Sequence, residues 1–241
     1  MKRKSGQKGR EAMLLTWNQV TGTAKEFHLK EISFSLEAGW FMVLAGVNGA
    51  GKTTLFRYML EEKKSYTGEI LLDGREIHED HKRTLNEIGY VSEDNSFFEE
   101  HTAMENARLL SVFYKQWEEE LFIKAMKDME LSLNKTVGKM SRGEYMKFQM
   151  AFAMAHKPKL YLLDEATGGM DPVFRRDFYK IIRKILEGEN ASVLLTSHIQ
   201  EEIEKQADYI GFMENGKLIR FGENREESSF YGKTEERQEK K

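Results

Sequence analysis

Short apolar runs separated by polar residues recur along this chain and predict β-strands. The pair Asp73-Gly74 lies between two such runs and is typical of a two-residue hairpin turn, whose central positions both need positive φ. We therefore expect the runs on either side of it to pair as a hairpin. The predicted strands cover residues 14–18, 32–36, 41–45, 68–72, 75–77, 87–92, 160–163, 192–195 and 209–213.

The apolar spacing changes to that of a helix in several longer stretches. Helical spacing covers residues 103–129, 143–155 and 172–186, and a helix is also expected from Thr54 onward. Because continuous apolar strands that alternate with helices are typical of a buried sheet, we expect an α/β fold with a largely parallel sheet. The stretch from about 95 to 157 is expected to be an inserted helical subdomain. Its methionines and aromatics are interpreted as core, with a groove for a partner helix as the alternative.

Composition limits the classes of function. The chain has 241 residues and a net charge of -3, which provides no electrostatic argument for nucleic-acid binding. It contains no cysteine, which excludes disulfide and thiolate chemistry. We find no apolar run long enough to span a bilayer and no signal peptide, so a membrane role would require a partner. Residues 1–12 are expected to form a basic arm and residues 223–241 a charged tail.

Residues 46–53 carry the most specific motif. They read Gly-Val-Asn-Gly-Ala-Gly-Lys-Thr, which matches G-x-x-x-x-G-K-T, between a predicted strand and a predicted helix. The glycines let backbone N–H groups approach phosphate oxygens, and the helix N-terminus adds partial positive charge. Lys52 is expected to reach the β- and γ-phosphates of a nucleoside triphosphate, and Thr53 to coordinate Mg²⁺. The predicted nucleotide-binding residues here are Gly46, Asn48, Gly49, Ala50, Gly51, Lys52, Thr53 and Thr54.

Two later predicted strands end in polar residues that suit the same chemistry. Asp164 is expected to hold Mg²⁺ through water, and Glu165 to act as general base or to orient the attacking water. His198 follows the predicted strand at 192–195 and is expected to contact the γ-phosphate. Lys52, Glu165 and His198 are therefore the predicted catalytic residues.

Two further patterns have competing interpretations. Residues 168–171, Gly-Gly-Met-Asp, fit a tight turn that carries Asp171 toward a neighbouring subunit, or a plain turn before Pro172. Residues 78–81, His-Glu-Asp-His, resemble a metal-ligand cluster. Because they follow a strand in a polar stretch, we interpret them as a solvated loop.

Taken in order and spacing, the motifs resemble the nucleotide-binding subunit of an ABC transporter. They are the phosphate loop, the Leu-Leu-Asp-Glu strand, the Gly-Gly-Met-Asp loop and the Thr-Ser-His segment, and the resemblance covers about residues 13–222. It implies a P-loop NTPase core with an antiparallel β-subdomain and an inserted α-helical subdomain. It also implies an ATPase that uses ATP and Mg²⁺ and works as a dimer of cassettes around the nucleotides.

The family's signature segment, commonly Leu-Ser-Gly-Gly-Gln, corresponds to residues 140–144, which read Met-Ser-Arg-Gly-Glu. The resemblance implies that Ser141 and Gly143 contact the γ-phosphate of ATP held by the other cassette. Ser141 and Glu144 also match a capping box, and the two roles are compatible. Glu144 adds negative charge near the triphosphate, which Arg142 is expected to offset.

Two other positions depart from the family pattern. Glu93 stands where the family usually has a Gln that touches Mg²⁺, and because a carboxylate also coordinates this ion, Glu93 is a candidate metal ligand. The aromatic residue that usually stacks on adenine is missing from its expected place near Thr23. Trp17, Phe27 and His28 are the candidates for that role.

The resemblance implies a cytoplasmic ATPase subunit on the inner face of the cell membrane, attached through a separate transmembrane permease. The motifs are most similar to single-cassette subunits of bacterial exporters, and the second cassette would be an identical or a different chain. One alternative is an ABC-type ATPase switch that acts on a ribosome, DNA or a regulatory protein. It is disfavoured because neither tandem cassettes nor a long inserted coiled coil is recognisable. Another is a nucleotide-binding module with weak hydrolysis, which Glu165 and His198 disfavour.

Overall fold

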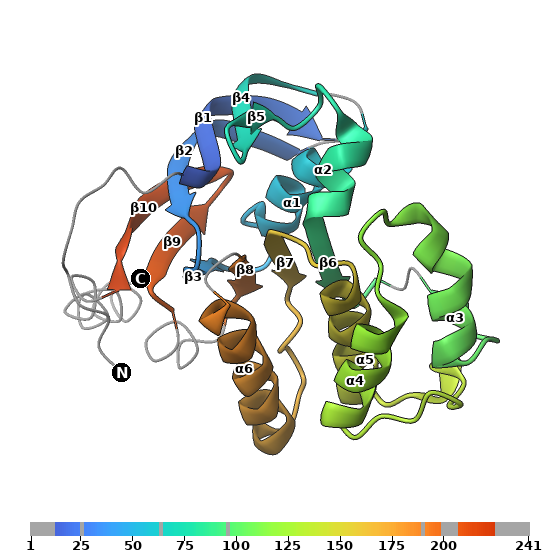
Figure 1. Ribbon diagram of the computed structural model, residues 1–241. Coiled ribbons are helices and arrows are strands. Elements are labelled where there is room, and N and C mark those ends of the chain that lie inside the picture. The colour runs from blue at the N-terminus through green and yellow to red at the C-terminus, as the bar shows by residue number, and fades with distance from the viewer. Residues whose placement is uncertain are drawn as a thin grey trace.

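In the part of the chain that the structure describes, two β-sheets with a helix between them and a layer of further helices make up the fold (Figure 1). The computed structural model describes residues 13–24, 27–62, 65–94, 97–188, 191–198 and 207–224. The predicted basic arm lies outside the described residues, as does the predicted charged tail beyond residue 224. Within the described ranges, no helix combines the length and the apolar character needed to cross a bilayer.

The smaller sheet is antiparallel, with the strand order β2-β1-β4-β5. Asp73 and Gly74 have φ of 52° and 71° and join the last two strands, which confirms the predicted hairpin. The first two strands run beyond the predicted 14–18 and 32–36 because register shifts near Gln19 break the simple alternation. The strands are β1 (Met13–Ala24), β2 (Phe27–Glu37), β4 (Tyr66–Leu72) and β5 (Arg75–Glu76).

The central sheet has the order β10-β9-β3-β8-β7-β6, and all its neighbouring strands are parallel except β9 and β10. The largely parallel sheet is therefore confirmed. The strands are β3 (Phe41–Ala45), β6 (Ile88–Ser92), β7 (Leu160–Asp164), β8 (Ser192–Ser197), β9 (Tyr209–Glu214) and β10 (Lys217–Glu223). β10 was not predicted, because it is an edge strand with no fully buried side chain and its polar residues hide the alternation.

Both faces of the central sheet are covered, which is why its strands read as continuous apolar runs. On one face, Phe41 and Val43 join a core with the helices of the outer layer. On the other face, Met42 and Leu44 pack with α1 (Lys52–Leu60) and the antiparallel sheet. The outer helices are α3 (Ala103–Leu110), α4 (Glu119–Asp128), α5 (Arg142–Ala155) and α6 (Pro172–Glu187).

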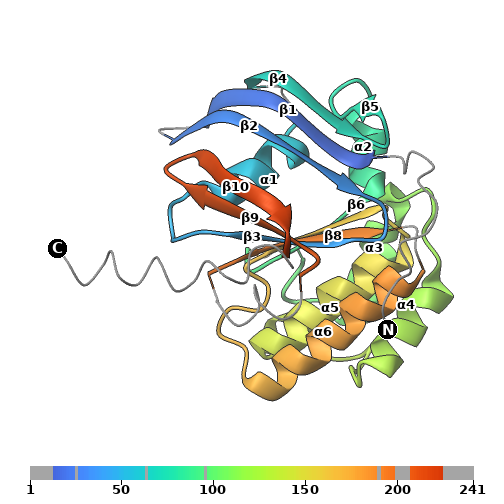
Figure 2. The ribbon, with the colours of Figure 1, turned by 90° about the vertical axis from the view of Figure 1, so that its left-hand side faces the viewer.

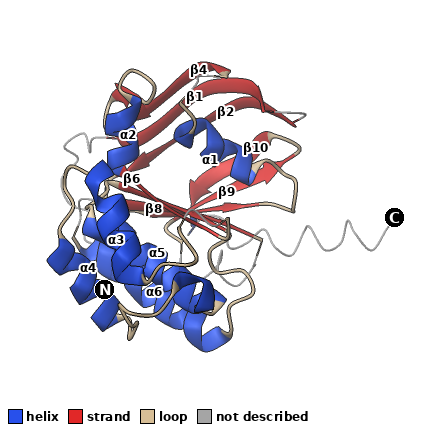
Figure 3. Cartoon of the chain, turned by 90° about the vertical axis from the view of Figure 1, so that its right-hand side faces the viewer, coloured by secondary structure: helices blue, strands red, loops and turns tan. Residues whose placement is uncertain are grey.

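Figures 2 and 3 show the resulting layers, with α1 between the two sheets and the larger helices on the opposite side of the central sheet. The helices α3, α4 and α5 lie in sequence between β6 and β7, as expected of an inserted helical subdomain. They share one hydrophobic core with the sheet. A movement of the insertion must therefore be accommodated by that shared core.

One expectation for the region before β6 is confirmed only in part. Residues 78–80 form a turn in which Glu79 and Asp80 are exposed, as expected of a solvated loop, but His81 is the first residue of α2 (His81–Glu87). Asp80 is its N-cap and accepts a hydrogen bond from the backbone N–H of Arg83. The helix is only seven residues long and too short for a clear apolar period. This explains why the pattern did not predict it.

The apolar stripe of the helical insertion is only partly core. Phe122 and Met126 are fully buried, as interpreted. Val112 and Phe113 lie in a short 3₁₀ turn after α3 and are 77% and 70% exposed, which contradicts a core role for them. Apolar side chains this exposed are unusual on a monomer when they are adjacent.

Candidate active site

The loop between β3 and α1 encloses the side chain of Lys52. Gly49 and Gly51 have φ of 80° and 107°, which glycine adopts without a steric cost, and Gly51 is the N-cap of α1. Lys52 is only 4% exposed, and its Nζ donates to the carbonyl oxygens of Gly46 at 2.7 Å and Val47 at 3.2 Å. The loop thus fixes a buried positive charge beside its own backbone.

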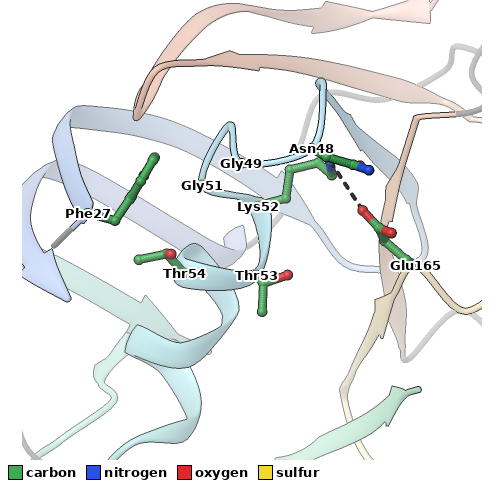
Figure 4. A pocket seen from close by; sticks show the side chains of 8 residues that line it. All are labelled: Phe27, Asn48, Gly49, Gly51, Lys52, Thr53, Thr54 and Glu165. Carbon is green, nitrogen blue, oxygen red and sulfur yellow. Dashed lines mark ion pairs between the residues drawn. The ribbon is translucent and has the colours of Figure 1, made fainter. Parts of the chain in front are cut away.

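The carboxylate of Glu165 faces this positive charge. Its Oε1 lies 3.3 Å from Lys52 Nζ (Figure 4). Glu165 follows β7 and has a φ of 47°, a left-handed conformation that is uncommon outside glycine. Its backbone N–H donates to Thr196 Oγ1 at 2.9 Å. Strained residues held by their neighbours in this way are concentrated at functional sites.

Asp164 ends β7 and is buried against the adjacent strand. Thr196 Oγ1 donates a hydrogen bond to Asp164 Oδ1 at 2.6 Å. Burial raises the pKa of the Asp164 carboxyl, while hydrogen bonds from Thr196 and Thr53 lower it. Thr53 and Asp164 offer oxygen donors side by side, and Mg²⁺ prefers such hard ligands. The residues present therefore fit the metal ion that the phosphate loop implies.

A pocket of about 290 Å³ opens at this loop. In Figure 4, Phe27 and Glu165 lie on opposite sides of the loop, so the pocket has an aromatic end and a charged end. Gly46 and Ala50 belong to the loop but do not line the pocket. The Gly46 carbonyl accepts a hydrogen bond from Lys52 Nζ, and Ala50 is buried. The lining residues are Phe27, Asn48, Gly49, Gly51, Lys52, Thr53, Thr54 and Glu165.

The three aromatic candidates for stacking on adenine occupy different places. Trp17 is 1% exposed and stacks on Phe34 with ring centroids 5.9 Å apart, so it is a core residue. His28 is exposed and its Nδ1 is hydrogen-bonded to Thr23 Oγ1 at 2.8 Å. Phe27 lines the pocket and lies against Gly51.

His198 lies at the carboxyl end of β8, next to the end of β7. Its Nδ1 is 4.0 Å from Glu165 Oε2, and its side chain is half exposed. The structure therefore brings together the three predicted catalytic residues, Lys52, Glu165 and His198.

The segment at 140–144 lies outside the lining of this pocket. Ser141 is the N-cap of α5, and the capping box is complete: its N–H donates to Glu144 Oε2 at 2.7 Å, and Glu144 N–H donates to Ser141 Oγ at 3.3 Å. Lys135 Nζ donates to both Glu144 oxygens and holds the pKa of that carboxyl below its usual range. Lys135 therefore offsets the charge of Glu144, a role expected of Arg142. Gly143 packs against the ring of Phe174.

Two other predicted residues have defined partners in the structure. Glu93 forms an ion pair with Arg142 and is absent from the pocket lining. Asp171 is the N-cap of α6 and accepts hydrogen bonds from the backbone N–H groups of Val173 and Phe174. The plain turn before Pro172 thus accounts for Asp171 within one chain.

Two polar residues at the site were not singled out from the sequence. Thr196 links Asp164 and the backbone of Glu165. Gln149 of α5 makes two hydrogen bonds to the backbone of Ser92. Each is a buried polar residue that directly follows a buried apolar one, Leu195 or Phe148, and a polar residue in such a position is the signal that was available.

Comparison with known proteins gives a consistent result. The family model for ABC transporter matches residues 29–168. The chain is 31% identical over 192 residues to the bacitracin transport ATP-binding protein BcrA of Bacillus licheniformis, an alignment that covers 78% of this chain and 62% of that protein. The chain therefore spans less than two thirds of that relative's length.

A second relative matches over most of both lengths. The lantibiotic transport ATP-binding protein SrtF of Streptococcus pyogenes is 28% identical over 208 residues, which is 86% of this chain and 89% of that protein. Among solved structures, an ATP binding subunit of an ABC transporter superposes with a TM-score of 0.81 at 24% identity, over 91% of this chain and 93% of that one. This last likeness establishes the shared fold.

Proposed function

The chain belongs to the ABC transporter family, and from that premise we propose that it binds and hydrolyses ATP to drive a separate membrane permease. The observation that carries the proposal is the convergence of Lys52, Asp164 and Glu165 at one loop. A buried cation, an acid suited to Mg²⁺ and a strained second acid are the parts that phosphoryl transfer to water needs.

The roles of the individual residues follow from their positions. Lys52 and the N–H groups of residues 48–53 bind the phosphates, and Phe27 stacks on adenine at the other end of the pocket. Glu165 orients the attacking water and accepts its proton, and His198 contacts the γ-phosphate. Thr53, Asp164 and Glu93 are the candidate metal ligands. Bound Mg²⁺ would supply neutralisation of the phosphate charge.

A second cassette completes the site in this proposal. Ser141 and Gly143 lie outside the pocket that Lys52 lines, so they act on nucleotide bound to a partner, which is an identical or a different cassette. Ser141 stands at the N-terminus of α5, where helix N–H groups and the dipole favour a phosphate anion.

A membrane permease is the proposed second partner, and it would hold the chain at the cytoplasmic face of the membrane. The names of the bacitracin and lantibiotic relatives assign those proteins to the transport of such compounds, which supports a peptide or antibiotic as the substrate; the direction that we propose is export. Leu109, Val112 and Phe113 also support a protein partner, because they are 49%, 77% and 70% exposed on adjacent turns of the helical insertion.

The proposal is tested by the mass in solution of the Glu165→Gln variant, with and without ATP and Mg²⁺. This variant is expected to bind ATP, hydrolyse it slowly and accumulate as a dimer. The matched control is Lys52→Ala/Glu165→Gln, which should remain monomeric because it lacks the phosphate ligand. Wild-type turnover by Glu165→Gln would contradict the assigned role of Glu165. A variant that binds ATP yet stays monomeric would contradict a self-sufficient homodimer, and mass measurement should then be repeated with the membrane partners.

A further inference from the structure

Gln149 fixes the end of β6 to the helix that begins with the signature segment. Its Oε1 accepts a hydrogen bond from Ser92 N–H at 3.2 Å, and its Nε2 donates to Ser92 C=O at 2.8 Å. Gln149 is 4% exposed and Ser92 is 3% exposed. Because water cannot readily replace buried hydrogen bonds of this kind, they hold this part of α5 permanently to the residue that precedes Glu93.

Two turns earlier on the same helix, Arg142 holds Glu93 itself. The two side chains form an ion pair and are 43% and 47% exposed. The Arg142 guanidinium lies over Gly169, which has a φ of 64°, and a Cβ at that position would lie 2.6 Å from Arg142 Nη1. A side chain at Gly169 would therefore displace the guanidinium. Three segments meet at this pair: the segment after β6, the first turn of α5 and the segment after β7.

The two contacts differ in how easily they open. A pair of exposed charges changes an equilibrium by about fivefold at most, because water and salt screen it. The Gln149 contact is enclosed and pairs both backbone groups of Ser92. The buried Gln149–Ser92 contact therefore behaves as a pivot, and the exposed Arg142–Glu93 pair as a releasable link.

We propose that Arg142 is a positioning residue that holds Glu93 away from the nucleotide pocket until a competing cation replaces Arg142 as the partner of Glu93. Gln149 is the pivot about which Glu93 then moves. Both charged residues stand where the family pattern has uncharged ones, and their charges are opposite, so each supplies the partner of the other. The consequence for nucleotide binding rests on the proposed function, whereas the existence of the Arg142–Glu93 link does not depend on it.

The link is tested first in nucleotide-free protein by a double-mutant cycle. Unfolding equilibria are measured for wild type, Glu93→Gln, Arg142→Gln and the double variant. We expect a coupling of about two- to fivefold that weakens with added salt. The matched control is a second cycle in which Lys139→Gln takes the place of Arg142→Gln. Lys139 is an exposed cation three residues before Arg142, and Glu93→Gln combined with Lys139→Gln should show no coupling. Purely additive effects for the first pair would overturn the proposal.

The pivot is tested by repeating that cycle in a Gln149→Met background. Methionine keeps the length of the side chain and loses both hydrogen bonds. If Gln149 positions Glu93, the Glu93–Arg142 coupling should disappear. If Gln149 only adds stability, the coupling should persist at its original size, and the pivot is refuted.

The competition is tested by the dissociation constant of ATP with Mg²⁺ and with EDTA. With Mg²⁺ present, Arg142→Gln is expected to bind ATP about two- to fivefold more tightly than wild type, because Glu93 is free to bind the metal. In EDTA, the variant should show no such gain. Loss of a cation near a triphosphate would otherwise weaken binding, so the sign is diagnostic. The double variant with Glu93→Gln should lose the gain. Weaker or unchanged binding by Arg142→Gln overturns the competition, whereas a wild type that fails to bind ATP refutes the proposed function and leaves the nucleotide-free cycle valid.

Discussion

Lys52 Nζ lies 3.3 Å from Glu165 Oε1, so the cation that would hold a phosphate and the carboxylate that would face the attacking water neutralise each other in this structure. An unpaired ammonium with 4% exposure would be costly, because few water molecules can reach it. The γ-phosphate of a bound nucleotide would take over as the partner of Lys52. Glu165 would then be released as an acceptor at the place where hydrolysis requires one.

Lys52→Ala should therefore remove most of the affinity for ATP. Loss of a buried charged contact to a phosphate corresponds to about a hundredfold or more in dissociation constant. The measurement is equilibrium binding of ATP with Mg²⁺, together with the hydrolysis rate. Lys124→Ala, on the surface of α4, serves as a control for the loss of a positive charge. Unchanged hydrolysis by Lys52→Ala would show that the loop is not the phosphate site.

Thr196→Val should lower turnover about tenfold while ATP affinity changes little. Valine has nearly the same shape but leaves the Glu165 N–H without its hydrogen-bond partner and removes the hydrogen bond that Thr196 donates to the buried Asp164 carboxylate. Since the bond from Thr196 lowers the pKa of the Asp164 carboxyl, its loss should also move the acidic limb of the rate profile to higher pH. Hydrolysis rates are measured across pH for this variant and for Thr196→Ser, which keeps the hydroxyl. A Thr196→Val profile that overlays the wild type would rule out the positioning role.

Phe27→Ala should weaken ATP binding about fivefold and leave binding of inorganic tripolyphosphate unchanged. The ring contributes stacking and apolar contact to a base and nothing specific to phosphates. Phe27→Tyr should retain ATP affinity, and His28→Ala is the neighbouring control because that side chain is directed to Thr23. Equal losses for ATP and tripolyphosphate would mean that Phe27 shapes the loop rather than the base site.

The phosphate loop, the parallel strands of the central sheet and the meeting of Lys52 with Glu165 could all be predicted from the sequence. The reason is physical: a local glycine pattern determines the loop, and parallel strands bring their carboxyl ends to one edge of a sheet. Phe27 was one of three candidates, because the path of β1 and β2 depends on bulges that no simple alternation reveals. The sequence places Thr196 in the Thr-Ser-His motif but does not predict its two hydrogen bonds, because these depend on the register of β7 against β8.

The pairing of Glu93 with Arg142 lay beyond the reach of pattern analysis for a related reason. The two residues are 49 positions apart, and their contact depends on how α5 packs against β6. Arg142 was instead expected to offset Glu144, its neighbour in sequence, whereas Lys135 takes that place. Proximity along the chain was a poor guide here, because the first turn of α5 directs residues 142 and 144 to different neighbours.

His156 should make the helical insertion sensitive to acid. It is the C-cap residue of α5, is 2% exposed and stacks on Tyr114 with ring centroids 4.2 Å apart. Burial lowers the pKa of His156 from 6.5 to about 4 in the folded protein. Below pH 6.5 the unfolded chain takes up a proton at this residue that the folded chain does not, so the free energy of unfolding falls by about 3 kcal/mol between pH 6.5 and 4 and then levels off.

The test is denaturant unfolding of wild type and His156→Phe across that range, since phenylalanine keeps the aromatic stack and cannot be protonated. The difference in unfolding free energy between the two proteins removes the contribution of the carboxylates, which they share. It should grow in favour of His156→Phe by about 3 kcal/mol as the pH falls from 6.5 to 4. His28→Phe, at an exposed histidine, is the matched control for the exchange of a histidine for a phenylalanine. A pH-independent difference for His156→Phe would mean that His156 is already accessible to protons in the folded state.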